Sequence, residues 1–288
     1  LLGRVEAALA RLPAGTPSTV PAPAVTPLAG RSVTIVEKPG SATAISFGHP
    51  IELKRGSRDF YALWLANSWL GEHRNSSSHL YQVIREARGM NYGDYSYIEI
   101  FPEGGFRSMP PSNVPRRRQL FEVWIRPVPN EQAHFALRAA MREVESLAKN
   151  GLTADQFAVT KAFLSKYCLH FAETTSEKLG YALDDRRHGI GAPGHLENFR
   201  RIVPQLTRDE VNAAVRRYLK PENLHIAMVS ALGDTLGTRL AAGEASPMRY
   251  ATPKPQSVLD DDRVIEAYPL GIRREAIRNV PVDRMFER

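Results

Sequence analysis

The sequence predicts an α+β fold in which helices pack on one face of a mostly antiparallel sheet. Two β-branched, alternating runs come first, at residues 31–38 and 42–53, and Pro39-Gly40 separates them. A block of helix-periodic segments follows, and an apolar run at residues 223–231 reads as a strand that returns to the sheet. Strands, then helices, then a returning strand are typical of an α+β domain.

The composition is that of a globular protein. The 288 residues are 43% hydrophobic and 24% charged, which is enough for one large core or two smaller ones. The net charge of +7 is scattered, apart from short basic runs at residues 116–118 and 186–188, so we expect no nucleic-acid surface. No run of about 18 apolar residues occurs, so we expect no membrane span. The single cysteine, Cys168, is interpreted as a buried, unreactive thiol.

The chain is predicted to have three parts. Residues 1–30 hold a short amphipathic helix, ended by Pro13, and a linker with five prolines and no charges. We interpret this part as the last helix of a preceding half and its connection. The α+β domain is expected to span residues 31–245. Residues 246–288 are only weakly periodic and are expected to form an extended C-terminal tail.

Helix and strand signals fill the first half of the domain. Asp59 is expected to cap a buried helix over residues 60–72, and three serines precede a second helix over residues 79–89. Strand-like runs at residues 92–100 and 121–127 then enclose a loop rich in proline and glycine.

Helices dominate the second half of the domain. A long helix over residues 131–151 ends in an Asn-Gly pair, and Thr153 caps another that is predicted to continue to residue 188. Two shorter helices follow. The last of them begins with Thr207 and Glu210, which have the spacing of a capping box.

The eight histidines do not follow the spacing of a peptidase zinc site. Such sites place two histidines on one helical face with a glutamate as base, and neither H-E-x-x-H nor H-x-x-E-H occurs. His73 and His79, near Glu72, are six positions apart and are assigned to a loop and a helix cap. His188 and His195 are assigned to a surface loop. We therefore predict no metal ligand in this chain; a G-x-S-x-G turn and a phosphate loop are also absent.

Arg85 and Tyr92 form a pair whose setting is defined. Arg85 lies late in a predicted helix and Tyr92 follows the stop at Gly89, so the two side chains can converge although they are seven residues apart. A guanidinium and a phenol can both donate to a carbonyl oxygen, and in a dry cleft they would stabilise an oxyanion. The alternative is structural: Arg85 pairs with the helix C-terminus and Tyr92 packs as a strand aromatic. Spacing alone favours the structural interpretation.

Residues 76–100, SSSHLYQVIREARGMNYGDYSYIEI, resemble the second-half signature of the insulinase and pitrilysin-like zinc metallopeptidases. The positions that match this signature are Leu80, Arg85, Glu86, Arg88, Gly89, Met90 and Tyr92. The segments GLTADQFAVTKAFL and YLKPENLHIAMVSA resemble later motifs of the family and occur in the family's order. The resemblance covers about residues 31–245.

The resemblance implies a half-domain of the insulinase and mitochondrial processing peptidase type. One half of such enzymes binds zinc through H-x-x-E-H and a downstream glutamate. Another half closes over it and binds the substrate backbone through an arginine and a tyrosine, which here are Arg85 and Tyr92. Because H-x-x-E-H is absent, the chain is expected to be the non-catalytic half of a zinc-dependent peptidase and to be inactive alone. Zinc is expected in the catalytic half, and the expected partners are that half-domain or subunit and a peptide substrate.

An alternative within the same fold is a non-peptidase scaffold or assembly subunit. Such a protein would not need Arg85 and Tyr92. The sequence does not define the compartment, since a periplasmic or cell-envelope location and a cytoplasmic one both fit a chain with one cysteine.

Overall fold

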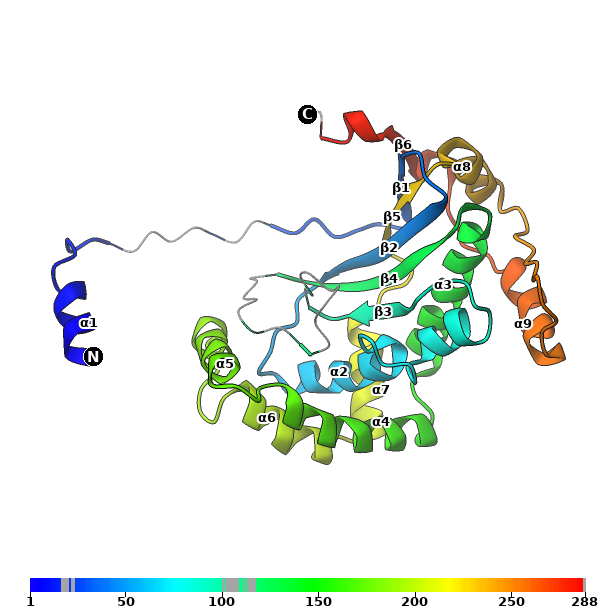
Figure 1. The fold of residues 1–288 in the computed structure, drawn as a ribbon. Helices are drawn as coiled ribbons and strands as arrows, with labels where there is room; N and C mark the ends of the chain where they lie inside the picture. The colour runs from blue at the N-terminus through cyan, green and yellow to red at the C-terminus, as the bar shows by residue number, and fades with distance from the viewer. Residues whose placement is uncertain are drawn as a thin grey trace.

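A six-stranded sheet forms the centre of the molecule (Figure 1). The computed structural model describes residues 1–16, 21, 24–99, 101, 109, 110, 112 and 118–286. Most of the predicted proline- and glycine-rich loop, including Arg116 and Arg117, lies outside these residues. The strands are Ser32–Glu37 (β1), Ala42–Ile51 (β2), Asp94–Tyr97 (β3), Gln119–Pro129 (β4), His225–Ser230 (β5) and Ile277–Pro281 (β6).

The sheet is mixed and mostly antiparallel. Its strand order is β3-β4-β2-β5-β1-β6. β2 runs antiparallel to both β4 and β5, and β3 runs antiparallel to β4. Among the strands that the structure describes, the parallel pairings are those of β1 with β5 and of β1 with β6. The predicted fold class is therefore confirmed.

The core lies on one side of the sheet. In β2 the side chains of Ile45, Phe47, His49 and Ile51 are buried, and the residues that alternate with them are partly exposed. In β5, Ile226 and Met228 are buried but their neighbours are exposed, so this strand is buried on one face only and not throughout. This two-residue alternation is what a strand between a core and a less covered face requires.

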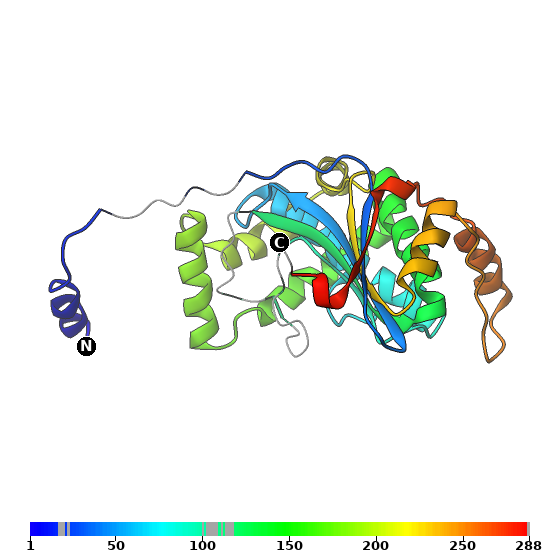
Figure 2. The same cartoon turned by 90° about the horizontal axis from the view of Figure 1, so that it is seen from above.

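Helices cover the buried face (Figures 1 and 2). The main ones are α2 (Arg58–Gly71), α3 (Ala133–Asn150), α4 (Ala154–Tyr167) and α7 (Arg208–Tyr218). α2 is apolar on most of its surface and packs against α7, α4 and β3. α3 ends at Gly151, as the Asn-Gly pair predicted.

The start of α2 differs from the prediction by two residues. Ser57, not Asp59, is the N-cap, and its Oγ accepts from the backbone N–H of Phe60 at 3.2 Å. Asp59 in the first turn instead accepts from Arg217 and from the Tyr218 hydroxyl, both at 2.9 Å. The residue that looked like a cap thus joins α2 to α7.

The helix predicted from Thr153 to residue 188 is broken in two. α4 ends at Tyr167, a 3-10 turn follows, and α5 spans Thr175–His188. Thr174 and Glu177 form a capping box: the Thr174 Oγ accepts from the Glu177 N–H at 3.1 Å, and the Glu177 carboxylate accepts from the Thr174 N–H at 2.8 Å. This local signal starts a new helix and explains why the single-helix prediction was wrong.

The other helix starts agree with the sequence, except near His195. Thr153 and Thr207 each begin a helix with a complete capping box, as predicted. The assignment of His195 to a surface loop was wrong. His195 begins α6 (His195–Ile202), is 2% exposed, and stacks on the Tyr61 ring at 5.6 Å.

The C-terminal segment carries more regular structure than its composition indicated. α8 (Gly233–Ala242) packs beside β1 and β6. Residues 246–288, predicted as an extended tail, contain α9 (Gln256–Glu266) and return to the sheet as β6 (Figure 2). Short 3-10 segments occupy Asn130–Gln132, Cys168–His170, Val203–Gln205, Arg274–Ala276 and Val282–Arg284.

The N-terminal helix stands apart from this body. α1 (Leu2–Leu9) has no buried residue, and Figure 1 shows it separated from the sheet by the linker. Across the residues that the structure describes, every helix is too short or too polar to cross a lipid bilayer.

The one-sided core makes a first prediction. Phe47→Ala should lower the free energy of unfolding by about 3–5 kcal/mol, because Phe47 is 1% exposed and its loss leaves a cavity beneath β2. Phe286→Ala is the matched control, since that ring is 88% exposed. Denaturant titration measures both. Equal losses in the two variants would contradict this assignment of the core.

Candidate functional site

The segment that carries the R-x6-Y pattern begins as a π-helix. Residues Tyr81–Glu86 (η1) form this element, where an α-helix was predicted. The Ala87 N–H donates to the Gln82 carbonyl five residues back at 3.0 Å, while the Val83 carbonyl accepts from the Arg88 guanidinium at 2.7 Å. The side chain of Arg88 therefore takes part in the wider turn. π-helical turns are rare and are found frequently at functional sites.

Arg85 lies on this element with its side chain 36% exposed. Its guanidinium carbon is 5.3 Å from the centre of the Tyr81 ring, and it forms an ion pair with Glu86. The Arg85 Nε is buried and has no hydrogen-bond partner among the described residues. A buried N–H without an acceptor is costly, and this donor of Arg85 is left unused by the described residues.

Tyr92 lies on the far side of the turn and is 85% exposed. The backbone turns at Gly89, whose φ of 69° is in the left-handed region that favours glycine. The aromatic ring in contact with Arg85 is that of Tyr81, which the sequence pattern did not single out. Arg85 and Tyr92 thus flank one turn, and Tyr92 extends from it into solvent.

The turn is fastened to the sheet by Asn91. Its Nδ2 donates to Asp94 Oδ1 at 2.8 Å and to the Arg126 carbonyl at 3.0 Å, and its Oδ1 accepts from the Gly93 N–H at 3.0 Å. The Arg126 N–H in turn donates to the Gly93 carbonyl at 3.3 Å. The backbone on either side of Tyr92 is therefore held against β4.

Asp94 is a fully buried acid at the start of β3. Burial raises the pKa of Asp94 to about 8, and the hydrogen bond from Asn91 opposes this shift. One of its oxygens, Oδ2, has no hydrogen-bond partner among the described residues. The carboxyl group is consequently favoured in its protonated form at neutral pH.

His73 and His79 lie near this segment and contact different partners, and Glu72 is buried beside them. The His73 Nδ1 lies 2.7 Å from the Tyr97 hydroxyl. The His79 Nε2 lies 2.6 Å from Glu143 Oε2 on α3. Burial raises the pKa of Glu72 to about 7. Within the described ranges, no group of three or more His, Cys, Asp or Glu side chains is placed to hold a metal ion.

The fold and the site together define an α+β metallopeptidase-type half-domain whose described residues offer no zinc ligand set. A family model described as the peptidase M16 inactive domain matches residues 1–164, which is more than half of the 288 residues. The chain belongs to this family. The resemblance to the insulinase-like zinc peptidases, predicted from residues 76–100, is confirmed at that level.

Similar proteins agree with this assignment. Uncharacterized zinc proteases of Mycobacterium tuberculosis and Mycobacterium bovis are 27% identical over 189 residues, which cover 65% of this chain and 38% of each relative. The chain therefore spans less than half the length of these relatives.

Two solved structures share the fold. A peptidase M16 inactive domain from Pseudomonas fluorescens has a TM-score of 0.60 at 22% identity, covering 79% of this chain and 48% of that one. A protease from Helicobacter pylori has a TM-score of 0.59 at 15% identity, covering 75% of this chain and 48% of that one.

The buried acid beside the turn makes the stability depend on pH. The pKa of Asp94 is about 8 in the folded chain and near 4 in an unfolded one, so the folded state binds more protons between these values. The free energy of unfolding should therefore fall as pH rises from about 4 to 8, by up to about 1.4 kcal/mol per pH unit for this group.

Asp94→Asn should reduce this slope, because the amide keeps an acceptor for Asn91 but does not titrate. Asp283→Asn, at an exposed position, is the control. Denaturant titrations at several pH values measure the slope. An unchanged slope in Asp94→Asn would show that Asp94 is ionised in the folded chain.

Proposed function

We propose that this chain is the non-catalytic half of a zinc-dependent peptidase and that it binds the peptide substrate through Arg85 and Tyr92. Membership of the M16 inactive domain family supports the first part, as does the similarity to mycobacterial zinc proteases. The observation that carries the second part is the position of two hydrogen-bond donors on either side of one anchored turn. Both side chains reach solvent.

The chemistry of the two side chains suits the backbone of a peptide. The planar Arg85 guanidinium can donate to a substrate carbonyl oxygen. The Tyr92 hydroxyl is a second donor. Two fixed donors of this kind would stabilise the negative charge that develops on that oxygen during hydrolysis.

Zinc is assigned to the other half of the enzyme. The described residues of this chain do not fit a zinc site. When bound in the catalytic half, zinc would supply an activated water molecule. That half is either part of the same polypeptide or a separate subunit, and in both cases it is the expected partner.

Loss of either donor should slow peptide hydrolysis. In the reconstituted enzyme, Arg85→Ala should lower kcat/KM by about 10²- to 10³-fold and Tyr92→Phe by a similar or smaller factor, as expected for donors to an oxyanion. Arg278→Ala is the control, since this exposed arginine lies on β6 at the opposite edge of the sheet. Full turnover in Arg85→Ala would overturn the proposal, and full turnover in Tyr92→Phe as well would favour a scaffold role.

The isolated chain should neither bind zinc stoichiometrically nor cleave peptides. Elemental analysis after dialysis against zinc measures the first property, and a fluorogenic peptide assay measures the second. Adding the catalytic half should restore cleavage. Peptide cleavage by the isolated chain, removed by a chelator, would contradict the division of labour proposed here.

A further inference from the structure

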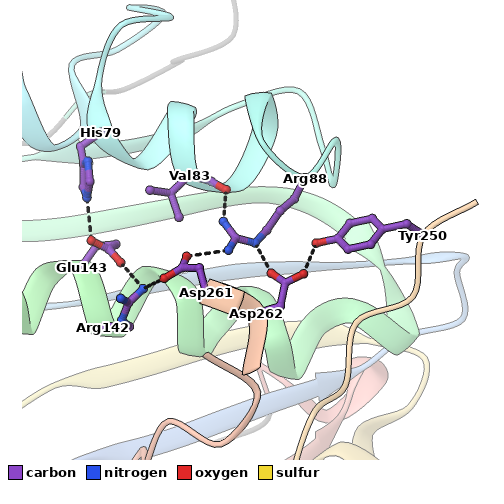
Figure 3. A network of polar contacts seen from close by, with 8 residues as sticks. All are labelled: His79, Val83, Arg88, Arg142, Glu143, Tyr250, Asp261 and Asp262. Carbon is purple, nitrogen blue, oxygen red and sulfur yellow. Dashed lines mark hydrogen bonds and ion pairs between the residues drawn. The ribbon is translucent and has the colours of Figure 1, made fainter. Parts of the chain in front are cut away.

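The C-terminal segment contacts the element that carries Arg85 (Figure 3). Arg88, three residues after Arg85, forms two ion pairs with α9: its Nε donates to Asp262 Oδ1 at 2.8 Å, and its Nη2 donates to Asp261 Oδ2 at 2.7 Å. The third donor, Nη1, reaches the Val83 carbonyl of η1 at 2.7 Å. One guanidinium thus joins the π-helix to a helix 173–174 positions further along the chain.

The ion pair between Arg88 and Asp262 is largely removed from water. The Arg88 side chain is 2% exposed and that of Asp262 is 8% exposed, while that of Asp261 is 34% exposed. Arg88 also lies 5.7 Å from the centre of the Phe135 ring of α3. A buried charge that loses its partner is strongly destabilising. The Arg88 side chain is therefore held in its place between α3 and α9.

Further contacts fix the two aspartates. The Tyr250 hydroxyl donates to Asp262 Oδ2 at 2.8 Å, and Arg142 forms an ion pair with Asp261, with its Nη1 2.9 Å from Oδ1. Arg142 also donates to Glu143 at 3.1 Å, and the other Glu143 oxygen lies 2.6 Å from His79.

The contacts hold the element at both ends, as Figure 3 shows. His79 precedes η1 and contacts Glu143, and Arg88 follows η1 and contacts Asp262. Arg85 therefore lies between two residues that are held by the same network of ion pairs and hydrogen bonds. At the C-terminal end, the Lys254 ammonium also donates to the Ala87 carbonyl at 2.8 Å. A cation at this position suits the unpaired carbonyls of a helix end.

We propose that Asp262 and Asp261 of α9 are positioning residues for the substrate-binding pair. They act through Arg88, which fixes the position of the turn between Arg85 and Tyr92. The inference rests on the proposed function of that pair and extends it to a segment outside residues 1–164, the part matched by the family model. Misplacing a reacting group by about 1 Å can cost about 100-fold in rate, so this support matters for turnover.

Kinetics of the reconstituted enzyme test the inference. Asp262→Asn keeps the size of the side chain but removes its charge, and it should lower kcat by about 10- to 100-fold with Arg85 present. In an Arg85→Ala background the same substitution should cost less than about twofold, because its effect passes through Arg85. Equal losses in the two backgrounds would show a merely structural role and overturn the proposal.

Two further variants keep the test informative if Asp262→Asn does not fold. Asp260→Asn, on the same helix but exposed, should leave turnover unchanged. Tyr250→Phe removes one hydrogen bond to Asp262 and should act in the same direction as Asp262→Asn with a smaller effect. If Tyr250→Phe has the full activity of the parent and Asp262→Asn does not fold, the proposal fails.

Hydrogen exchange separates this inference from the proposed function. The Gly89 N–H, which donates to the Arg85 carbonyl at 2.7 Å, should exchange at least about tenfold faster in Asp262→Asn, while the amides of β2 keep their rates. Unchanged exchange at Gly89 would overturn the anchoring even if Arg85→Ala abolishes turnover. Faster exchange together with an Arg85→Ala variant of full activity would support the anchoring and overturn the proposed function.

Discussion

Alternate side chains of the central strands point into a core on one side of the sheet, and the rest of the molecule is arranged around that asymmetry. Helices that bury apolar surface have only one face to pack on, so α2, α3, α4 and α7 gather there. The opposite face is left less covered, with Val229 of β5 38% exposed.

The turn between Arg85 and Tyr92 lies where the helix layer meets the edge of the sheet, and it is held from two directions. Asn91 ties the Tyr92 side to β4 through backbone groups of Gly93 and Arg126. Arg88 ties the Arg85 side to α9. One attachment uses neutral hydrogen bonds and the other uses buried charge, so substitutions can weaken each of them separately.

Short-range patterns in the sequence predicted the strands and several helix starts, because neighbouring residues determine these features. Alternation predicted the strands β1 and β2, a capping threonine located the helix start at Thr153, and the Thr-x-x-Glu spacing located the start at Thr207. The same spacing at Thr174 begins α5, inside a stretch that was predicted as one long helix. Pairings between distant residues left no such pattern. The sequence around Arg88 does not predict its ion pair with Asp262. The sequence around His195 does not predict that its ring stacks on Tyr61.

The distance in sequence between Arg88 and Asp262 also bears on when the turn reaches its final form. A ribosome makes Arg85 and Tyr92 long before it makes α9, and an anchor that closes a loop of 174 positions cannot form until Asp262 has emerged. Contacts of such long range carry a large loop-closure cost and slow folding. The turn is therefore made early in synthesis but is secured late, by a segment that takes no direct part in forming the β2–β4 pairing.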